Sequence, residues 1–547
     1  MHRVTDSMSK RFLIVLSLAS FQWSCQTGAE TVGAKTASPT GEAEIVTLAS
    51  PSPLINFKIM VRVGSTADPV GKEGLAELTA SGLVEGGFGD PASPVKKDEL
   101  AKITLPWGRG AMPYAHVGPE TTTFHFTVPR DALDEYTAKV LRPMFASPLF
   151  LEGDVERLKK EQKAQVTSYR SEDLENLGLA AIDGMVNRGS RYVHRAFGSE
   201  SSIPNLSTQD AKSFFGRHYR RASVILGVST DDAETVGLLR SVVEELPEGQ
   251  SDATPALAAT PAMGRHAFVV EEPNAPAASV HVGFPLDVAR GHEDFWPLYV
   301  ASVWLGTHRD SFGRLYRAIR QERGYNYGNY SYIEHWDGRP RSLFQIFNQP
   351  RSRQYFSMWV RPVGYEHAQH TLKAAMWELD RLHREGLTEE QVIAAKGKAR
   401  VLYLNLGETV DRLLAAKMDD RFLGLSSGFL DDYLKSIDAV TLEQVNAAIK
   451  RHLCSKNARV LIVTNKDNAA KLAEDLKATD AVYGKGLADY EFPKAKLEDG
   501  REAWSVPVDK VDMIRLDAVW AHYPLELESV KHITVDELFK TGEFSAK

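Results

Sequence analysis

The sequence predicts an α+β protein built from two copies of one domain, and three observations carry this prediction. The composition is that of a globular chain, with 43% hydrophobic and 25% charged residues, which excludes a disordered or collagen-like protein. A helix-then-strand pattern in the first half of the chain recurs 234 to 236 residues later, as expected for a duplicated domain. A stretch rich in Pro, Ala and Thr at 247–264 separates the two copies.

The repeated pattern begins at Ser207 and again at Thr441. Both residues suit the position before a helix, because a side-chain hydroxyl accepts a hydrogen bond from the free amides of the first turn. An Arg-His pair lies near the end of each predicted helix, and strands rich in apolar residues follow at 222–228 and 458–463. We therefore expect each copy to form a mixed or antiparallel sheet packed with helices.

Apolar periodicity predicts the other elements of the first copy in chain order. An alternating apolar run indicates a strand at 55–63, and leucines at helical spacing indicate a helix at 72–86. Alternating β-forming residues indicate a second strand at 121–128. Helical spacing then continues over 131–146 and 153–186.

The first thirty residues predict export. Arg3, Lys10 and Arg11 precede an apolar run at 12–19 that is too short to span a bilayer, which is typical of a bacterial signal peptide. Cys25 follows at the place where a lipoprotein carries its acylated cysteine, so we treat it as a candidate lipidation site and the only means of membrane attachment. We expect the protein in the periplasm, or on the outer membrane of a Gram-negative type of bacterium as a lipoprotein.

Charge and cysteine content exclude several classes of function. The formal net charge of −7 gives no basic surface for nucleic acid. Two cysteines in 547 residues exclude a disulfide scaffold and the multi-cysteine zinc modules, and we expect Cys454 to be a core thiol.

These features divide the chain into six segments. The predicted segments are a signal peptide at 1–24, a flexible tether at 25–44, an N-terminal domain at 45–246, a linker at 247–264, a C-terminal domain at 265–475, and an extension at 476–547 that matches neither repeat.

The segment 61–76 ends one predicted strand in Gly-Ser and begins the next helix with Gly-Leu-Ala. It resembles the approach to the active-site helix of the pitrilysin/insulinase family of zinc peptidases. In that family His-x-x-Glu-His follows, with two imidazoles one helical turn apart to hold zinc and a glutamate as general base. Glu77, Ala80 and Ser81 stand at these positions here, so the resemblance implies a degenerate metal and base site.

The family's third zinc ligand is a glutamate on a later helix. The resemblance places this position at Thr167 or Ser168, neither of which is a good zinc ligand. Neither His-x-x-Glu-His nor His-Glu-x-x-His occurs anywhere in the sequence. The resemblance therefore implies two peptidase-like domains with no catalytic residue and no cofactor of their own, and zinc only in a partner.

The segment 312–327 resembles the Leu-Arg-x-x-x-Gly-x-x-Tyr segment of the family's later domain. Its apolar spacing predicts a helix that ends at Gly324, with Arg320 on the last turn and Tyr327 on the following strand. In the family this Arg–Tyr pair reaches across a clamshell and holds the substrate's backbone carbonyl. A guanidinium and a phenol can both donate to an oxygen that becomes negative during reaction, so the resemblance implies that Arg320 and Tyr327 bind substrate.

Lost zinc ligands combined with a retained Arg–Tyr pair resemble the non-catalytic subunit of the family's two-chain bacterial peptidases. This implies that the chain is not an enzyme on its own, forms half of a clamshell, and joins a zinc-bearing homologous subunit in a heterodimer that hydrolyses peptides. Two alternatives stay open. The chain could be a structural or peptide-binding scaffold with no role in hydrolysis, or an active zinc peptidase with atypical ligands.

Overall fold

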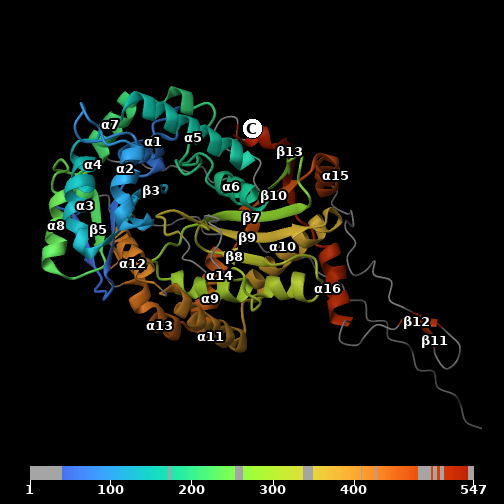
Figure 1. The fold of residues 1–547 in the computed structure, drawn as a ribbon. Coiled ribbons are helices and arrows are strands. Elements are labelled where there is room, and N and C mark those ends of the chain that lie inside the picture. The colour runs from blue at the N-terminus through green and yellow to red at the C-terminus, as the bar shows by residue number, and fades with distance from the viewer. Residues whose placement is uncertain are drawn as a thin grey trace, which may run out of the picture.

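The computed structural model describes a chain with two sheets, each accompanied by helices (Figure 1). The described residues are 38, 40–170, 174–252, 263–336, 349–407, 409–425, 428–477, 494–496, 502–504 and 511–539.

The first sheet has five strands in the order β1-β5-β2-β4-β3. β1 pairs with β5 in parallel, and the other neighbours are antiparallel. The strands are β1 (Glu44–Thr47), β2 (Leu54–Val61), β3 (Tyr114–Val117), β4 (Thr122–Pro129) and β5 (Val224–Val228).

The second sheet repeats this order as β6-β10-β7-β9-β8 and adds β13 beside β6. β6 and β10 are parallel, as are their counterparts β1 and β5. The prediction of two homologous α+β domains with mixed sheets is confirmed. The strands are β6 (Arg265–Glu271), β7 (Ala278–Leu286), β8 (Asn329–Tyr332), β9 (Gln354–Val363), β10 (Arg459–Thr464) and β13 (Leu527–Thr534), and a separate hairpin is formed by β11 (Lys494–Lys496) and β12 (Glu502–Trp504).

The first copy contains eight α-helices in its described residues. Of the helical stretch predicted at 153–186, the structure describes α5 up to Arg170 and α6 from Leu174. Ser207 caps α7 through a reciprocal capping box with Asp210. The helices are α1 (Leu75–Glu85), α2 (Lys97–Thr104), α3 (Leu133–Tyr136), α4 (Arg142–Ala146), α5 (Glu152–Arg170), α6 (Leu174–Val186), α7 (Thr208–His218) and α8 (Ala233–Val243).

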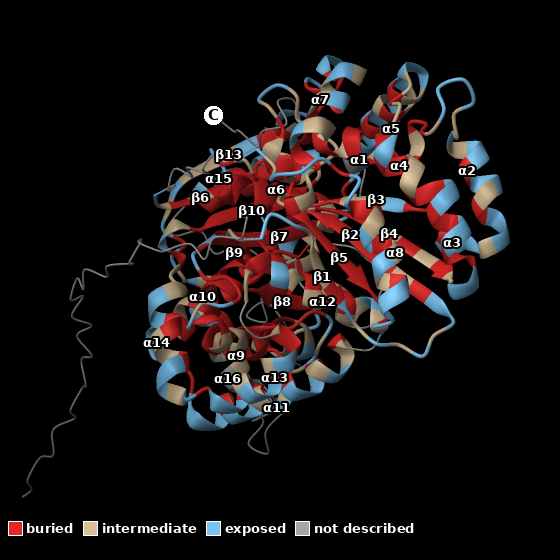
Figure 2. Ribbon diagram, turned by 90° about the vertical axis from the view of Figure 1, so that its left-hand side faces the viewer, coloured by how far each residue is buried: buried red, intermediate tan, exposed pale blue. Residues whose placement is uncertain are grey.

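The second copy and the extension supply the other helices. Thr441 caps α14 through the same kind of capping box, here with Gln444. The helices are α9 (Phe295–Leu305), α10 (Ala368–Glu385), α11 (Glu389–Leu406), α12 (Val410–Leu423), α13 (Phe429–Ala439), α14 (Leu442–His452), α15 (Lys466–Lys477), α16 (Val511–Ala521) and α17 (Val535–Phe539). Figure 2 shows that buried residues concentrate in the strands, while exposed residues lie on outer helices such as α11 and α14.

Each half of the molecule covers the other half's sheet with one helix. α6, from the first half, packs on β7, β9 and β10 of the second sheet, and α12 packs on β1, β2 and β5 of the first. Two glycines allow the close approach, since a Cβ at Gly178 would lie 2.0 Å from Nε2 of His281 and one at Gly227 would lie 2.2 Å from Sδ of Met418. The sequence did not indicate this exchange.

The C-terminal extension is part of the second half. β13 pairs in parallel with β6 over Leu527–Thr534, and α16 packs against α10. Ile533, Val535 and Leu538 join the hydrophobic cluster around α6. The extension therefore completes the second sheet and seals one side of α6.

Several predictions fall on the N-terminal residues. The signal peptide at 1–24 and most of the tether lie outside the described residues, as does Cys25, and they stay predictions. Cys454 is disulfide-bonded, so the expectation of a core thiol there is wrong. Because the sequence has only one other cysteine, Cys25, a disulfide within this chain and acylation of the Cys25 sulfur exclude each other. Within the described part of the chain, no helix has the length and apolar character needed to cross a membrane.

Replacing Gly178 by alanine should weaken the helix exchange, because the new methyl group would overlap the His281 ring. We expect a destabilisation of about 1–3 kcal/mol, measured as a lower urea midpoint. Gly237→Ala on α8 is the matched control, since a Cβ there has nothing within 4 Å and alanine favours a helix. A Gly178→Ala variant as stable as this control would contradict the close packing of α6.

Candidate substrate-binding site

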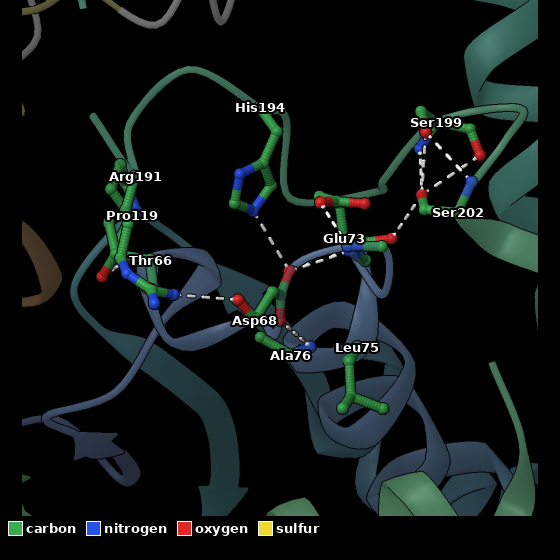
Figure 3. A network of polar contacts seen from close by, with 12 residues as sticks. Thr66, Asp68, Glu73, Leu75, Ala76, Pro119, Arg191, His194, Ser199 and Ser202 are labelled. Carbon is green, nitrogen blue, oxygen red and sulfur yellow. Dashed lines mark hydrogen bonds and ion pairs between the residues drawn. The ribbon is translucent and has the colours of Figure 1, made fainter. Parts of the chain in front are cut away.

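α1 begins beside a buried carboxylate, that of Asp68 (Figure 3). Its Oδ2 accepts a hydrogen bond from the backbone N–H of Gly74 at 2.8 Å, and its Oδ1 accepts one from Ala76 at 2.7 Å. Nε2 of His194 lies 3.2 Å from Oδ2. Burial raises the pKa of the Asp68 carboxyl above its usual range, although His194 and the two amides oppose this. The carboxylate fixes the start of the helix by holding its free amides.

A loop between α6 and α7 holds the segment that leads into α1. Nη1 of Arg191 donates to the carbonyls of Thr66 and Asp68 at 3.3 and 3.1 Å. Oγ of Ser202 donates to the carbonyl of Glu73 at 2.8 Å (Figure 3). Side chains of this loop thus bind the backbone of the segment that leads into α1. The side chains at 77, 80 and 81 take no part in these hydrogen bonds.

The positions that the sequence predicts as a degenerate metal and base site carry no suitable set of ligands. Ala80 is buried and offers only a methyl group, while Oγ of Ser81 donates to Oε1 of Glu77 at 3.3 Å. On α5, the exposed Thr167 donates its hydroxyl to the carbonyl of Lys163 at 3.1 Å. Structural and catalytic zinc sites need at least three imidazole, thiolate or carboxylate ligands, so these residues do not fit zinc. Among the described residues, no group of three or more His, Cys, Asp or Glu is placed to hold a metal ion.

The structure brings Arg320 and Tyr327 together. Arg320 lies in the last turn of a short π-helix, Tyr316–Gln321, and Gly324 then adopts the left-handed conformation at φ +72°. The Arg320 guanidinium lies 6.0 Å from the centre of the Tyr327 ring. The sequence predicted Tyr327 on the strand after the helix, but it lies in the bend before β8. The prediction of its position was therefore wrong.

The pair presents two hydrogen-bond donors at the surface. Tyr327 has 77% of its surface exposed, and Arg320 is partly exposed. Tyr316 completes the cluster, since its ring lies 4.9 Å below the Arg320 guanidinium and its hydroxyl accepts a hydrogen bond from Nη1. Tyr316 was not predicted as part of this site. Its spacing of four residues from Arg320 on a helix is nevertheless a signal for contact between the two side chains. The arrangement suits recognition of a carbonyl oxygen.

A buried ion pair joins the two halves of the molecule. Asp183 on α6 accepts hydrogen bonds from Nη1 and Nη2 of Arg351 at 3.0 and 3.2 Å. Burial raises the pKa of the Asp183 carboxyl, but the charges of Arg351, His335 and Arg195 outweigh this and bring it below its usual range. Both side chains are almost fully buried. No pattern in the sequence predicts this pair.

The family comparison concerns the middle of the chain. Residues 205–398 match the family model described as the peptidase M16 inactive domain. Among curated proteins, the chain is 22% identical over 358 residues to the non-peptidase homolog YmxG of Helicobacter pylori, covering 63% of this chain and 77% of that one. It is 25% identical over 336 residues to an uncharacterized zinc protease of Streptomyces coelicolor, covering 58% and 69%.

Solved structures share the fold. A peptidase M16 inactive domain from Pseudomonas fluorescens aligns with a TM-score of 0.65 and 19% identity, over 79% of this chain and 98% of that one. The periplasmic protease PqqL of Escherichia coli aligns with a TM-score of 0.62 and 12% identity, over 92% of this chain but 51% of PqqL.

The fold is that of two homologous peptidase-like α+β domains. The resemblance to the pitrilysin/insulinase family is confirmed by the match of residues 205–398 to the peptidase M16 inactive domain and by the non-peptidase relative.

Neutralising Asp183 should cost more than neutralising a less deeply buried acidic residue on the same helix. Asp183→Asn leaves Arg351 buried without its partner, and we expect a loss of about 3–5 kcal/mol at pH 7, measured by urea unfolding. Glu175→Gln on α6 removes a partly exposed pair with Arg361 and should cost at most about 1 kcal/mol.

The Asp183 effect should also depend on pH. Because the folded-state pKa is lowered, the stabilisation is complete above the unfolded-state pKa of about 3.9 and is lost as the pH falls below it. The difference between wild type and Asp183→Asn should therefore shrink when thermal unfolding is followed from pH 6 to pH 3. A constant difference across this range would contradict the ion pair.

Proposed function

We propose that this chain is the non-catalytic subunit of an exported zinc metallopeptidase. In this role it lends Arg320 and Tyr327 to the active site of a zinc-bearing homologous subunit, where they bind the peptide substrate. The observation that carries the proposal is the exposed Arg320–Tyr327 pair in a chain whose own metal positions hold no ligand set.

The geometry of the pair supports carbonyl binding. Tyr316 holds the Arg320 guanidinium from one side, which leaves its other N–H groups available to a ligand in the fixed fork of a guanidinium. The Tyr327 hydroxyl supplies another donor beside it. Donors that are held in place before the reaction stabilise a developing oxyanion best.

The relatives support pairing with a second peptidase-like chain. PqqL is a periplasmic protease of which this chain covers 51%, and a solved structure described as the first half of PqqL aligns over 90% of this chain. We infer that a separate homologous subunit supplies the other half here. The inactive-domain match and the non-peptidase relative fit zinc in that partner alone.

The test is reconstitution with the zinc-bearing homologue that co-purifies from the native host. Adding this chain should raise hydrolysis of a fluorogenic peptide, and Arg320→Ala should reduce that gain by about 10²–10³-fold, the cost of removing one oxyanion donor. Arg400→Ala is the control, because Arg400 is an exposed arginine on α11 paired with Asp438 and away from the Arg320 turn.

The outcomes separate the hypotheses. If Arg320→Ala stimulates as well as wild type, the assigned role is wrong. A stable complex that leaves hydrolysis unchanged would favour the scaffold alternative.

The purified chain should carry no stoichiometric zinc, because a carboxylate, a methyl group and hydroxyls stand at the ligand positions. Metal analysis of the chain alone, together with a peptidase assay, checks this. One zinc per chain with activity in the absence of a partner would establish the third alternative, an active peptidase with atypical ligands.

A further inference from the structure

Arg323 lies on the turn between Arg320 and Tyr327, yet its side chain points inward. Its guanidinium has no exposed surface. Nη1 donates to the carbonyl of Ala318 at 2.5 Å, which is one of the carbonyls at the end of the π-helix that carries Arg320. The same side chain therefore holds the end of that helix from inside the protein.

The partners of Arg323 come from the C-terminal extension. Nε donates to Oδ1 of Asp517 at 2.7 Å, and Nη2 donates to the carbonyl of Met513 at 3.1 Å. Both acceptors belong to α16. The guanidinium also lies 4.2 Å from the centre of the buried Trp520 ring on the same helix. Three contacts from one helix thus converge on one side chain of the turn.

Further titratable groups lie beside this contact. Asp517 is fully buried and also lies 3.1 Å from Nε2 of His370 on α10. Glu322 contacts Nη1 of Arg323 at 2.8 Å from the solvent side. A buried arginine–aspartate pair with further hydrogen bonds is directional and costly to separate.

The far side of the turn is fixed to the sheet. The side-chain amides of Asn326 and Asn329 exchange hydrogen bonds at 2.8 and 3.0 Å, and Nδ2 of Asn326 also donates to the carbonyl of Arg361 at 2.9 Å. Arg323 and Asn326 therefore anchor the turn on both sides of Gly324, whose Cβ position is open. Of the two anchors, only the one at Arg323 depends on the extension.

We propose that α16 positions the substrate-binding turn, with Arg323 and Asp517 as the positioning residues. This inference rests on the proposed function, and it assigns a role to the C-terminal extension. Holding 322–327 against α16 keeps Arg320 and Tyr327 in one geometry before the peptide arrives. Ordering the turn in advance removes an entropic cost from binding.

Hydrogen exchange on the full chain tests the anchoring. Asp517→Asn should speed exchange of the amides of Glu322, Gly324 and Tyr325 at least tenfold, because these amides bond to the helix end that Arg323 holds. The matched control is Tyr523→Phe, which removes the contact of the Tyr523 hydroxyl with Asp380 in the same extension but away from the turn. Equal exchange at the turn in Asp517→Asn and Tyr523→Phe overturns the inference.

Kinetics of the complex with the zinc-bearing homologue test the consequence. Asp517→Asn should raise KM for the fluorogenic peptide at least fivefold while the amount of complex stays constant, and Tyr523→Phe should leave KM unchanged. Asp517→Glu keeps the charge and should restore most of the affinity, and it serves as the folded variant where Asp517→Asn gives too little soluble chain.

The two proposals fail in different ways. Asp517→Asn could speed exchange at the turn and leave KM unchanged, while Arg320→Ala still abolishes stimulation. This result overturns the positioning role and leaves the proposed function standing. If Arg320→Ala is also without effect, the proposed function is overturned, and the positioning role with it.

Discussion

The structure depends on an exchange in which each half places one helix on the sheet of the other half. A sheet of this kind must have both faces covered to be buried, and here α6 and α12 each cover a face of the sheet that belongs to the other half. Apolar packing is not directional, so it does not by itself fix how far α6 slides along β7. The buried contact of Asp183 with Arg351 is directional. It therefore sets the position of the two halves, and with it the positions of α1 and of the turn that carries Arg320.

The architecture also explains how metal ligands can be absent without harm to the fold. The start of α1 is held by the Asp68 carboxylate, by Arg191 and by Ser202, which bind backbone groups of the approaching segment. The side chains at 77, 80 and 81 take no part in these contacts. The contacts that hold the start of α1 therefore do not depend on the residue types at these three positions.

The duplicated fold could be predicted from the sequence, because capped helices and apolar strands leave local patterns. Ser207 and Thr441 form the expected caps, and Gly324 ends its helix in the left-handed conformation. Periodicity shows that a helix has an apolar face but not which sheet covers it, so the exchange of α6 and α12 was not predictable. The position of Tyr327 before its strand was missed for a related reason, since boundaries leave weaker signals than elements.

The extension escaped prediction because its contacts are distant in sequence. β13 is a mostly half-exposed strand, and its partner β6 begins more than two hundred residues earlier. Likewise, neither Arg323 nor Asp517 belongs to a sequence motif. The role proposed for each residue follows only from its contact with the other. The site at Arg320 was found because a family pattern points to it, whereas the contacts that hold it in place follow from no pattern.

The separation of Arg323 and Asp517 has a consequence for the order of events on the ribosome. The two residues are 194 positions apart, and at typical rates of synthesis roughly 10–40 s pass between their additions to the chain. During this interval the nascent chain already contains Arg320 and Tyr327, but the helix that clamps their turn does not yet exist. A polypeptide released before residue 517 therefore carries both side chains on an unclamped turn, and only the finished chain presents them as a pair.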